Sequence, residues 1–135
     1  MFKVIIAGTR SFNDYEFLKQ KCDYYLKNED NIVIVSGKAS GADSLGEQYA
    51  QEKKYKIKEF PADWSNLDLK PSIIRKRSDG TTYNAYAGIH RNEEMAKYAD
   101  ALILFYDGKS KGSKAMLELA KKYNLKIKVV LYEKT

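Results

Sequence analysis

The stretch Lys3–Ser11 (KVIIAGTRS) decides the fold of this chain. A nearly continuous run of Val and Ile is typical of a strand that is covered on both faces, as in a parallel sheet. The run stops at Gly8, where a small polar loop begins. The same arrangement recurs twice, at Asn31–Val35 (NIVIV) before residues 36–43 (SGKASGAD) and at Ala101–Tyr106 (ALILFY) before residues 107–113 (DGKSKGS). These three units predict the central strands of a parallel sheet.

The remaining pattern completes an alternation of strands and helices. Two further apolar runs alternate with polar residues, which suits edge strands: Lys56–Phe60 (KIKEF) and Lys126–Tyr132 (KIKVVLY). Helical spacing is found in four segments: Asp14–Lys27, capped by Asn13 or Asp14, then Ala42–Lys54, Asn92–Tyr98 and Ser113–Tyr123. Because crossovers between parallel strands are right-handed, this order predicts an α/β fold. We expect a Rossmann-like three-layer sandwich of about five mostly parallel strands with helices on both faces.

Length and composition narrow the class of protein. The 135 residues fit one domain, residues 1–135, and 44% apolar with 31% charged residues is ordinary globular composition. The single cysteine, Cys22, excludes an internal disulfide and a cysteine zinc cluster. No apolar run approaches the ~20 residues of a membrane span, and no signal-peptide layout is present. We therefore expect a cytoplasmic protein without a metal or cofactor, whose net charge of +6 favours anionic partners.

One segment interrupts the alternation. Residues 62–86 contain a basic cluster (Arg75, Lys76, Arg77) and an Asp79-Gly80 turn signal, but no clear period. A structureless loop of this length is unusual in a compact domain. The segment is predicted to be either a surface excursion, such as a small hairpin, or a functional lid.

The three loops that follow the central strands share one chemistry. Each is rich in glycine and hydroxyl side chains, each includes a cation, and each leads toward a predicted helix. Glycine permits close backbone approach, and a helix N-terminus offers free N–H groups and a partial positive charge. In an open parallel sheet, ligands bind at the carboxyl ends of the strands. The loops therefore predict a phosphate or anion site, although none is a Walker A loop or a G-x-G-x-x-G turn.

Ordered motifs over most of the chain resemble the small single-domain branch of the SLOG superfamily. The first two match the GxRxFxD and SGGARGAD signatures, and the others match PADW, AGxxRNxxM and ADALIAFWDGxSxGT. In this sequence they are Gly8–Asp14 (GTRSFND), Ser36–Asp43 (SGKASGAD), Pro61–Trp64 (PADW), Ala87–Met95 (AGIHRNEEM) and Ala99–Ser113 (ADALILFYDGKSKGS).

The resemblance implies a Rossmann-like sheet and a nucleotide-related function. The superfamily includes Lonely guy-type phosphoribohydrolases and the Rossmann-like part of the DNA-processing protein of transformation. Many small members bind nucleotide-derived signals such as ADP-ribose-like molecules, often near bacterial and phage defence systems, and members commonly form dimers. The phosphoribohydrolases carry a Glu three residues after the Thr of their GGxGT loop. Here Ser113 aligns with that Thr, so Met116 stands where the Glu would be.

Candidate ligand-binding residues come from the loops and the matched motifs. They are Gly8, Thr9, Arg10, Ser36, Gly37, Lys38, Ser40, Gly41, Asp43, Trp64, Arg91, Asn92, Asp107, Gly108, Ser110, Gly112 and Ser113. The guanidinium groups of Arg10 and Arg91 can clamp phosphate, and Arg91 is expected to open the helix before the fourth strand. Structural ion pairs are the alternative role for both arginines. Asp43 either bonds ribose hydroxyls or favours a helix N-terminus, and Asp107 has the same two options. Trp64 either stacks on a base or packs as an anchor.

Three functions follow, in this order. The first is a non-catalytic sensor or sequestering protein that binds an ADP-ribose-like or cyclic nucleotide-like ligand, in phage–bacterium conflict. The second is a nucleotide N-glycosidase, which needs a carboxylate to stabilise an oxocarbenium-like centre or activate water. Its candidates are Asp43, Glu93, Glu94 and Asp107. The third, nucleic-acid binding, rests on the net charge and is ranked as unlikely, because most of the cations are lysines on helix faces.

Overall fold

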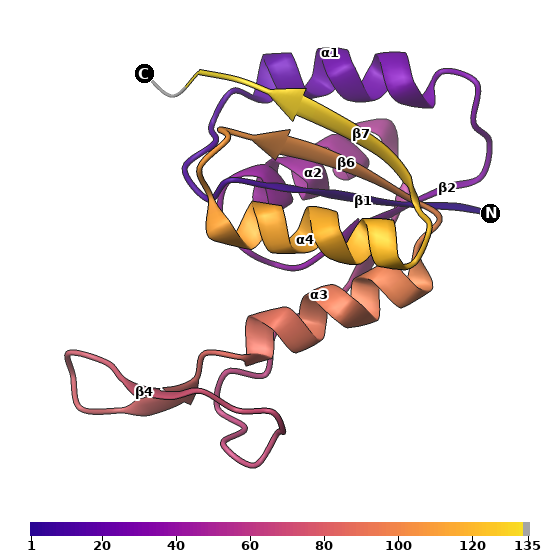
Figure 1. Ribbon diagram of the computed structural model, residues 1–135. Coiled ribbons are helices and arrows are strands. Elements are labelled where there is room, and N and C mark those ends of the chain that lie inside the picture. The colour runs from indigo at the N-terminus through magenta and orange to yellow at the C-terminus, as the bar shows by residue number, and fades with distance from the viewer. Residues whose placement is uncertain (134–135) are drawn as a thin grey trace.

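The computed structural model describes residues 1–133 and contains one five-stranded parallel sheet (Figure 1). Its strand order is β3-β2-β1-β6-β7, and each neighbouring pair is parallel. The strands are β1 (Phe2–Gly8), β2 (Ile32–Ser36), β3 (Lys56–Glu59), β6 (Ala101–Tyr106) and β7 (Lys126–Leu131). The two alternating runs form the edge strands, as predicted, while every residue of β2 is buried.

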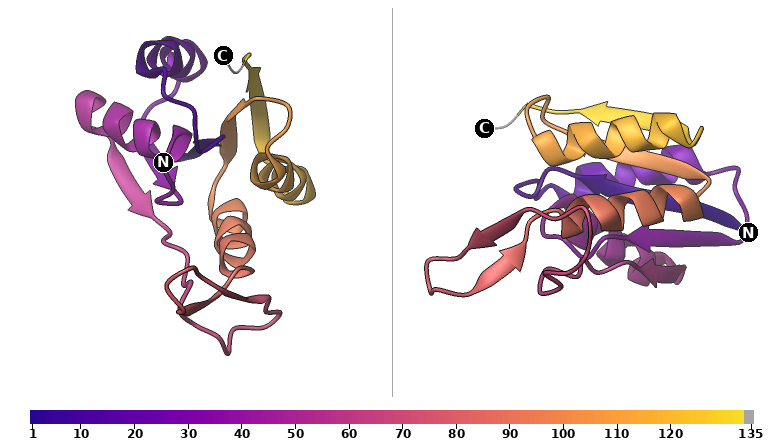
Figure 2. Two further views of the ribbon diagram at one scale, coloured as in Figure 1. Left: turned by 90° about the vertical axis from the view of Figure 1, so that its left-hand side faces the viewer. Right: turned by 60° about the horizontal axis from the view of Figure 1, so that its bottom comes forward.

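Four helices cover the two faces of the sheet, as the left panel of Figure 2 shows. They are α1 (Tyr15–Leu26), α2 (Ala42–Lys53), α3 (Ala87–Tyr98) and α4 (Lys111–Lys122). Alternation along β1 directs Val4 and Ile6 toward α1 and α2, where they join one core cluster. Ile5 points to the other face and packs in the cluster that α3 and α4 build. The Rossmann-like three-layer sandwich is therefore confirmed.

Two helix starts differ from the sequence expectation. The helix α3 begins at Ala87, well before Asn92, and its N-cap residue, Tyr86, makes no side-chain cap. The helix α4 begins at Lys111 and is capped by Ser110, whose Oγ accepts from the N–H of Ser113 at 3.3 Å. The α1 cap is Asp14, one of the two predicted candidates, which accepts from the N–H of Phe17.

The segment between β3 and α3 contains a small antiparallel hairpin of β4 (Ile74–Lys76) and β5 (Thr82–Asn84). It projects away from the sheet beyond the first turn of α3 (Figures 1 and 2). All three residues of β4 are exposed, so this hairpin has no hydrophobic core of its own. A lid role for the segment stays a prediction.

Asn84, which is fully buried, holds this segment together. Its Oδ1 accepts from the N–H groups of Ile73 and Tyr86, both at 3.0 Å. Its Nδ2 donates to the carbonyls of Asn66 (3.2 Å) and Leu69 (3.1 Å). A buried amide with every donor and acceptor used rigidifies its surroundings. The segment is thus ordered around one polar side chain.

Across residues 1–133, none of the helices combines the length and the apolar composition that crossing a bilayer requires.

Candidate functional site

A cavity of about 800 Å³ opens at the carboxyl ends of β1 and β6, between the first turns of α2 and α4. Many of the predicted residues meet there: Gly8, Thr9, Arg10, Asp43, Arg91, Asn92, Asp107, Ser110, Gly112 and Ser113. Its apolar lining includes Met95, Leu104 and Met116, all of them buried. This cavity, which we call the main cavity, lies where an open parallel sheet places its ligands.

Close backbone approach shapes the loop after β1. A Cβ on Gly8 would lie 2.1 Å from the carbonyl oxygen of Phe105, so β1 and β6 could not pair as they do with any other residue there. Gly41 has a positive φ of 75°, and a Cβ on it would lie 2.3 Å from the carbonyl oxygen of Arg10. Thr9 joins the loop after β1 to the loop after β6, because its Oγ1 accepts from the N–H of Asp107 at 3.3 Å. The walls of the main cavity are therefore set by backbone contacts.

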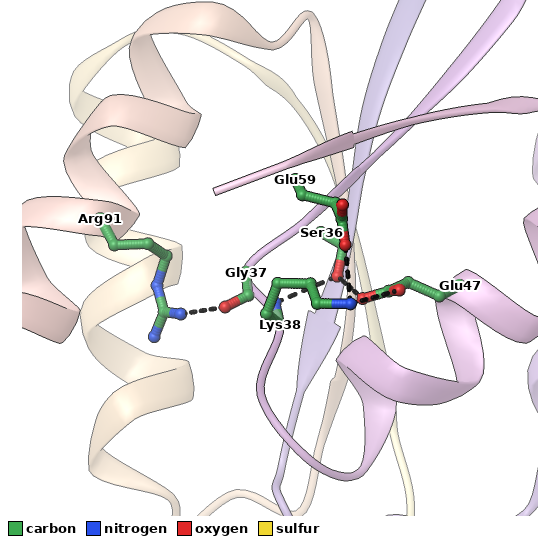
Figure 3. Close-up of polar contacts among 6 residues, drawn as sticks. All are labelled: Ser36, Gly37, Lys38, Glu47, Glu59 and Arg91. Carbon is green, nitrogen blue, oxygen red and sulfur yellow. Dashed lines mark hydrogen bonds and ion pairs between the residues drawn. The ribbon is translucent and has the colours of Figure 1, made fainter. Parts of the chain in front are cut away.

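The loop after β2 is held by a cluster of charges that Figure 3 shows. Lys38 adopts a left-handed backbone (φ 63°), and its Nζ lies 3.0 Å from Glu47 and 2.7 Å from Glu59. Ser36 donates through Oγ to Glu47 at 2.6 Å and accepts from the N–H of Lys38 at 3.1 Å. Two carboxylates thus neutralise Lys38, and the hydroxyl of Ser36 serves the loop itself.

Arg91 reaches this loop from α3, as Figure 3 shows. Its Nη1 donates to the carbonyl of Gly37, and its Nε donates to Oδ1 of Asn92 at 2.8 Å. The side chain comes from the second turn of α3, so the expectation that Arg91 opens the helix was wrong. Burial lowers the pKa of Arg91, and Arg10 adds to this, while Asp43 opposes it. The guanidinium is nevertheless charged at any ordinary pH.

Asp43 is the buried acid of the main cavity and lies in the first turn of α2. Burial raises its pKa to about 6, although Arg91, the N–H groups of Ala39 and Gly37 and the charge of Arg10 all favour the ionised form. The carboxylate and the Arg91 guanidinium flank Gly37, where a Cβ would lie 2.8 Å from Asp43 Oδ2 and 3.0 Å from Arg91 Nη1. A side chain at this position would make the carboxylate or the guanidinium shift.

The third loop presents hydroxyls at the N-terminus of α4. Asp107 folds the turn, because its carboxylate accepts from the N–H groups of Lys109 and Ser110, both at 2.9 Å. Ser113 is only 4% exposed, and its Oγ has no hydrogen-bond partner among residues 1–133. A buried hydroxyl without a partner is costly, and this one lines the main cavity. It is thus a donor and acceptor available to a bound molecule.

Trp64 lies outside the main cavity, in a neighbouring hollow of about 410 Å³ that we call the Trp64 hollow. Gly37, Lys38 and Ser40 line this hollow, and Arg10 and Arg91 line both spaces. Three predicted residues line neither: Ser36, Gly41 and Gly108. The structure therefore divides the predicted residues between two adjoining spaces.

Several residues of the site escaped the sequence prediction. Glu47 lies four residues after Asp43 on α2, and that helical spacing is the signal that could have found it. Glu59 and Leu104 belong to the strand patterns and carry no separate signal, whereas Met95 ends the matched motif Ala87–Met95. Of the carboxylates proposed for hydrolysis, Asp43 and Asp107 line the main cavity, whereas Glu93 pairs with Lys97 at 3.5 Å on α3.

A metal centre finds no support in the described part of the chain. Within residues 1–133, His, Cys, Asp and Glu side chains nowhere gather in threes as metal ligands would.

Comparisons with known proteins agree with this geometry. Residues 2–66 match the model of the YspA, cpYpsA-related SLOG family (YAcAr). The fold resembles DNA processing protein A from Streptococcus pneumoniae, with a TM-score of 0.70 and 20% identity over 98% of this chain and 51% of that one. No curated protein matches the chain with statistical significance.

The structure of DNA processing protein A from Helicobacter pylori, which concerns its single-stranded DNA binding mode, is also similar. Its TM-score is 0.65, with 23% identity over 98% of this chain and 66% of that one. The present chain thus spans about half to two thirds of these structures. Residues 2–66 are thus similar to a SLOG family, and the fold is Rossmann-like, as it is in the two solved structures.

Proposed function

We propose that the protein binds a nucleotide or nucleotide-derived ligand in the main cavity, as a sensor or a sequestering protein in phage–bacterium conflict. The observation that carries this proposal is the unpartnered, buried Oγ of Ser113 on the wall of a cavity that also receives Arg10 and Arg91. The volume of about 800 Å³ is within the range of small-molecule sites. The SLOG match and the Rossmann-like fold support a function connected with nucleotides or nucleic acids.

Each part of a nucleotide has a counterpart in the main cavity. Phosphate oxygens suit the two guanidinium groups and the N-terminus of α4, where Gly112 lets a ligand approach the backbone. Ribose hydroxyls suit the carboxylate of Asp43. The apolar surface of Met95, Leu104 and Met116 in the same cavity would pack against the apolar parts of this ligand. An ADP-ribose-like or cyclic nucleotide-like molecule fits this combination.

The residue at the position of the hydrolytic Glu favours binding over turnover. Met116 is 2% exposed and lines the main cavity, so α4 supplies a thioether there instead of a carboxylate. A thioether neither accepts a proton at neutral pH nor activates water.

Two measurements test the proposal. Mass spectrometry of the purified protein identifies any co-purified ligand, and thermal shifts with a nucleotide panel, including ADP-ribose and cyclic nucleotides, measure binding to the folded state. The Ser113→Ala variant should lose ligand-induced stabilisation while its ligand-free form stays folded. The matched control is Ser78→Ala, on the exposed hairpin, which should behave as the parent protein. A panel in which no compound raises the melting temperature contradicts the proposal.

A nucleotide N-glycosidase is the second candidate, and the raised pKa of Asp43 favours it. A carboxyl group with a pKa of about 6 can exchange a proton near neutral pH, and it faces the main cavity. Chromatographic release of free base from nucleoside monophosphates, lost in Asp43→Asn, would support this activity. Absence of free base with enzyme in excess of substrate would exclude it.

Binding to single-stranded nucleic acid is the third candidate. The Helicobacter pylori protein is described as a single-stranded DNA binder, and Arg75, Lys76 and Arg77 are exposed on the hairpin here. Such binding would weaken steeply with salt. Fluorescence anisotropy with labelled single-stranded DNA at rising salt tests it, and the absence of a salt-dependent signal removes it.

A further inference from the structure

The Trp64 hollow adjoins the main cavity through shared walls. Arg10, Ala39 and Arg91 line both spaces, so these three residues form the wall between them. A ligand that occupied both would pass the two arginines on its way. The main cavity and the Trp64 hollow are thus the two ends of one site, and we call the place where they meet, at Arg10 and Arg91, the junction.

The outer side of the Trp64 hollow is apolar and held in place. Its wall consists of Pro61, Ala62 and the half-buried indole of Trp64. The indole packs against Gly88, where a Cβ would lie 3.0 Å from Cη2, and its ring meets that of Tyr83 edge-on at 6.4 Å between centroids. An indole fixed in this way offers a preformed surface for a flat aromatic group such as a nucleobase.

Two cationic groups, Arg10 and Arg91, lie at the junction, and Lys109 lines the main cavity alone. Lys38 also lines the Trp64 hollow, but Glu47 and Glu59 neutralise it. Lysines make all of the ion pairs found within residues 1–133. Arg91 bonds to a carbonyl and an amide oxygen, and Arg10 is exposed, so the one carboxylate that interacts with both guanidinium groups, Asp43, leaves the junction with a net positive charge. The two arginines therefore attract the anionic part of a ligand to the junction.

We propose that the Trp64 hollow is a second subsite of the main cavity and that the site binds a linear ligand with two ends. The base of a nucleoside diphosphate occupies the Trp64 hollow, its diphosphate lies at Arg10 and Arg91, and a sugar linked to the diphosphate enters the main cavity beside Ser113. This inference rests on the proposed function and deepens it, because it selects two-ended nucleoside diphosphate derivatives over mononucleotides and cyclic nucleotides.

Isothermal titration calorimetry with matched probes tests the inference on the full chain. The probes are AMP, ADP, ADP-ribose, UMP, UDP-glucose and a cyclic mononucleotide. The two-ended member of at least one base series should bind about tenfold or more tightly than its monophosphate, because its sugar adds contacts in the main cavity to a base and phosphate that are already placed. A two-ended probe that gains nothing over the monophosphate overturns the inference.

Two variants separate the subsites. Ser40 is exposed and lines the Trp64 hollow but not the main cavity, so Ser40→Leu should weaken the monophosphate and the two-ended probe alike, because both place their base in this hollow. Ser11 is exposed and lines the main cavity but not the Trp64 hollow, so Ser11→Leu should remove the advantage of the two-ended probe and weaken the monophosphate much less. Equal effects of the two variants on both probes would contradict the division into subsites.

The outcomes also distinguish this inference from the proposed function. If monophosphates bind and Ser113→Ala weakens them, but two-ended probes bind no better, only the inference fails. If none of the probes binds, the proposed function and the inference fail together.

Discussion

The loops at the carboxyl edge of the sheet and the segment 62–86 are built in opposite ways. At the sheet edge, backbone meets backbone at Gly8 and Gly41, with no room for a side chain at either position. In the segment, one buried side chain, Asn84, ties together strands whose own residues are mostly exposed. The geometry of the main cavity therefore belongs to the sheet itself, whereas the order of the segment depends largely on one buried amide that bonds to the surrounding backbone.

The largest expected loss of stability comes from a substitution at the sheet edge, Gly8→Ala. In Gly8→Ala the new Cβ would overlap the carbonyl oxygen of Phe105, so β1 and β6 must separate, and a loss of about 4 kcal/mol or more of unfolding free energy is expected. Urea denaturation measures it. The control is Gly112→Ala, where nothing lies within 4 Å, so the stability should stay or rise. Equal stability of the two variants would contradict the backbone account.

The next effect separates the segment from the sheet. Asn84→Ala leaves two N–H groups and two carbonyls without their partner, which costs about 2–3 kcal/mol. Hydrogen exchange should quicken around β4 and β5 while amides of β1, β2 and β6 keep their protection. Asn28→Ala, at an exposed position, is the control. Faster exchange throughout the sheet would show that the segment supports the whole domain.

Much of the sheet edge was predictable, because its signals are local. The uninterrupted apolar run of β2, the alternation of β3 and β7 and the cap at Asp14 follow from residue type and spacing. Position at the end of a parallel strand then brings Arg10, Asp43 and Ser113 to one cavity, although they are far apart in the sequence.

What escaped prediction depends on contacts that have no periodicity. The four hydrogen bonds of the Asn84 side chain reach residues up to 18 positions away, and an asparagine before a helix looks like any loop residue. The start of α3 was missed because Tyr86 provides no side-chain cap and Gly88 is a weak helix former. The ion pairs of Lys38 with Glu47 and Glu59 could not be predicted either, because they depend on how α2 and β3 lie relative to the loop after β2.

The unfolding free energy should also depend on pH through Asp43 at the sheet edge, with an effect of intermediate size. Because folding raises the pKa of Asp43 from 3.8 to about 6, its contribution to stability is full below pH 3.8 and is lost as the pH rises through 6. Asp43→Asn should remove this dependence and be about 3 kcal/mol more stable than the parent protein at pH 7.5. Urea denaturation of both proteins at pH 4, 6 and 7.5 measures the difference. A difference that does not grow with pH contradicts the burial of an ionised carboxylate.

The smallest effect concerns one hydroxyl at the sheet edge. Ser113→Ala removes a buried group without a partner, so the ligand-free variant should gain up to about 1 kcal/mol. Differential scanning calorimetry of the two proteins measures the change. A clear loss of stability would mean that the hydroxyl already has a structural partner.

The segment leaves and rejoins the domain at one point. The N–H of Asn84 donates to the carbonyl of Trp64 at 2.7 Å, so the two ends of the intervening chain already touch. A connection of almost any length can span such a gap without moving the sheet. Insertion, deletion or exchange of these residues would leave the strands and their loops in register. The contact between Trp64 and Asn84 therefore marks a place where a different accessory segment could be inserted, by evolution or by engineering, beside an unchanged main cavity.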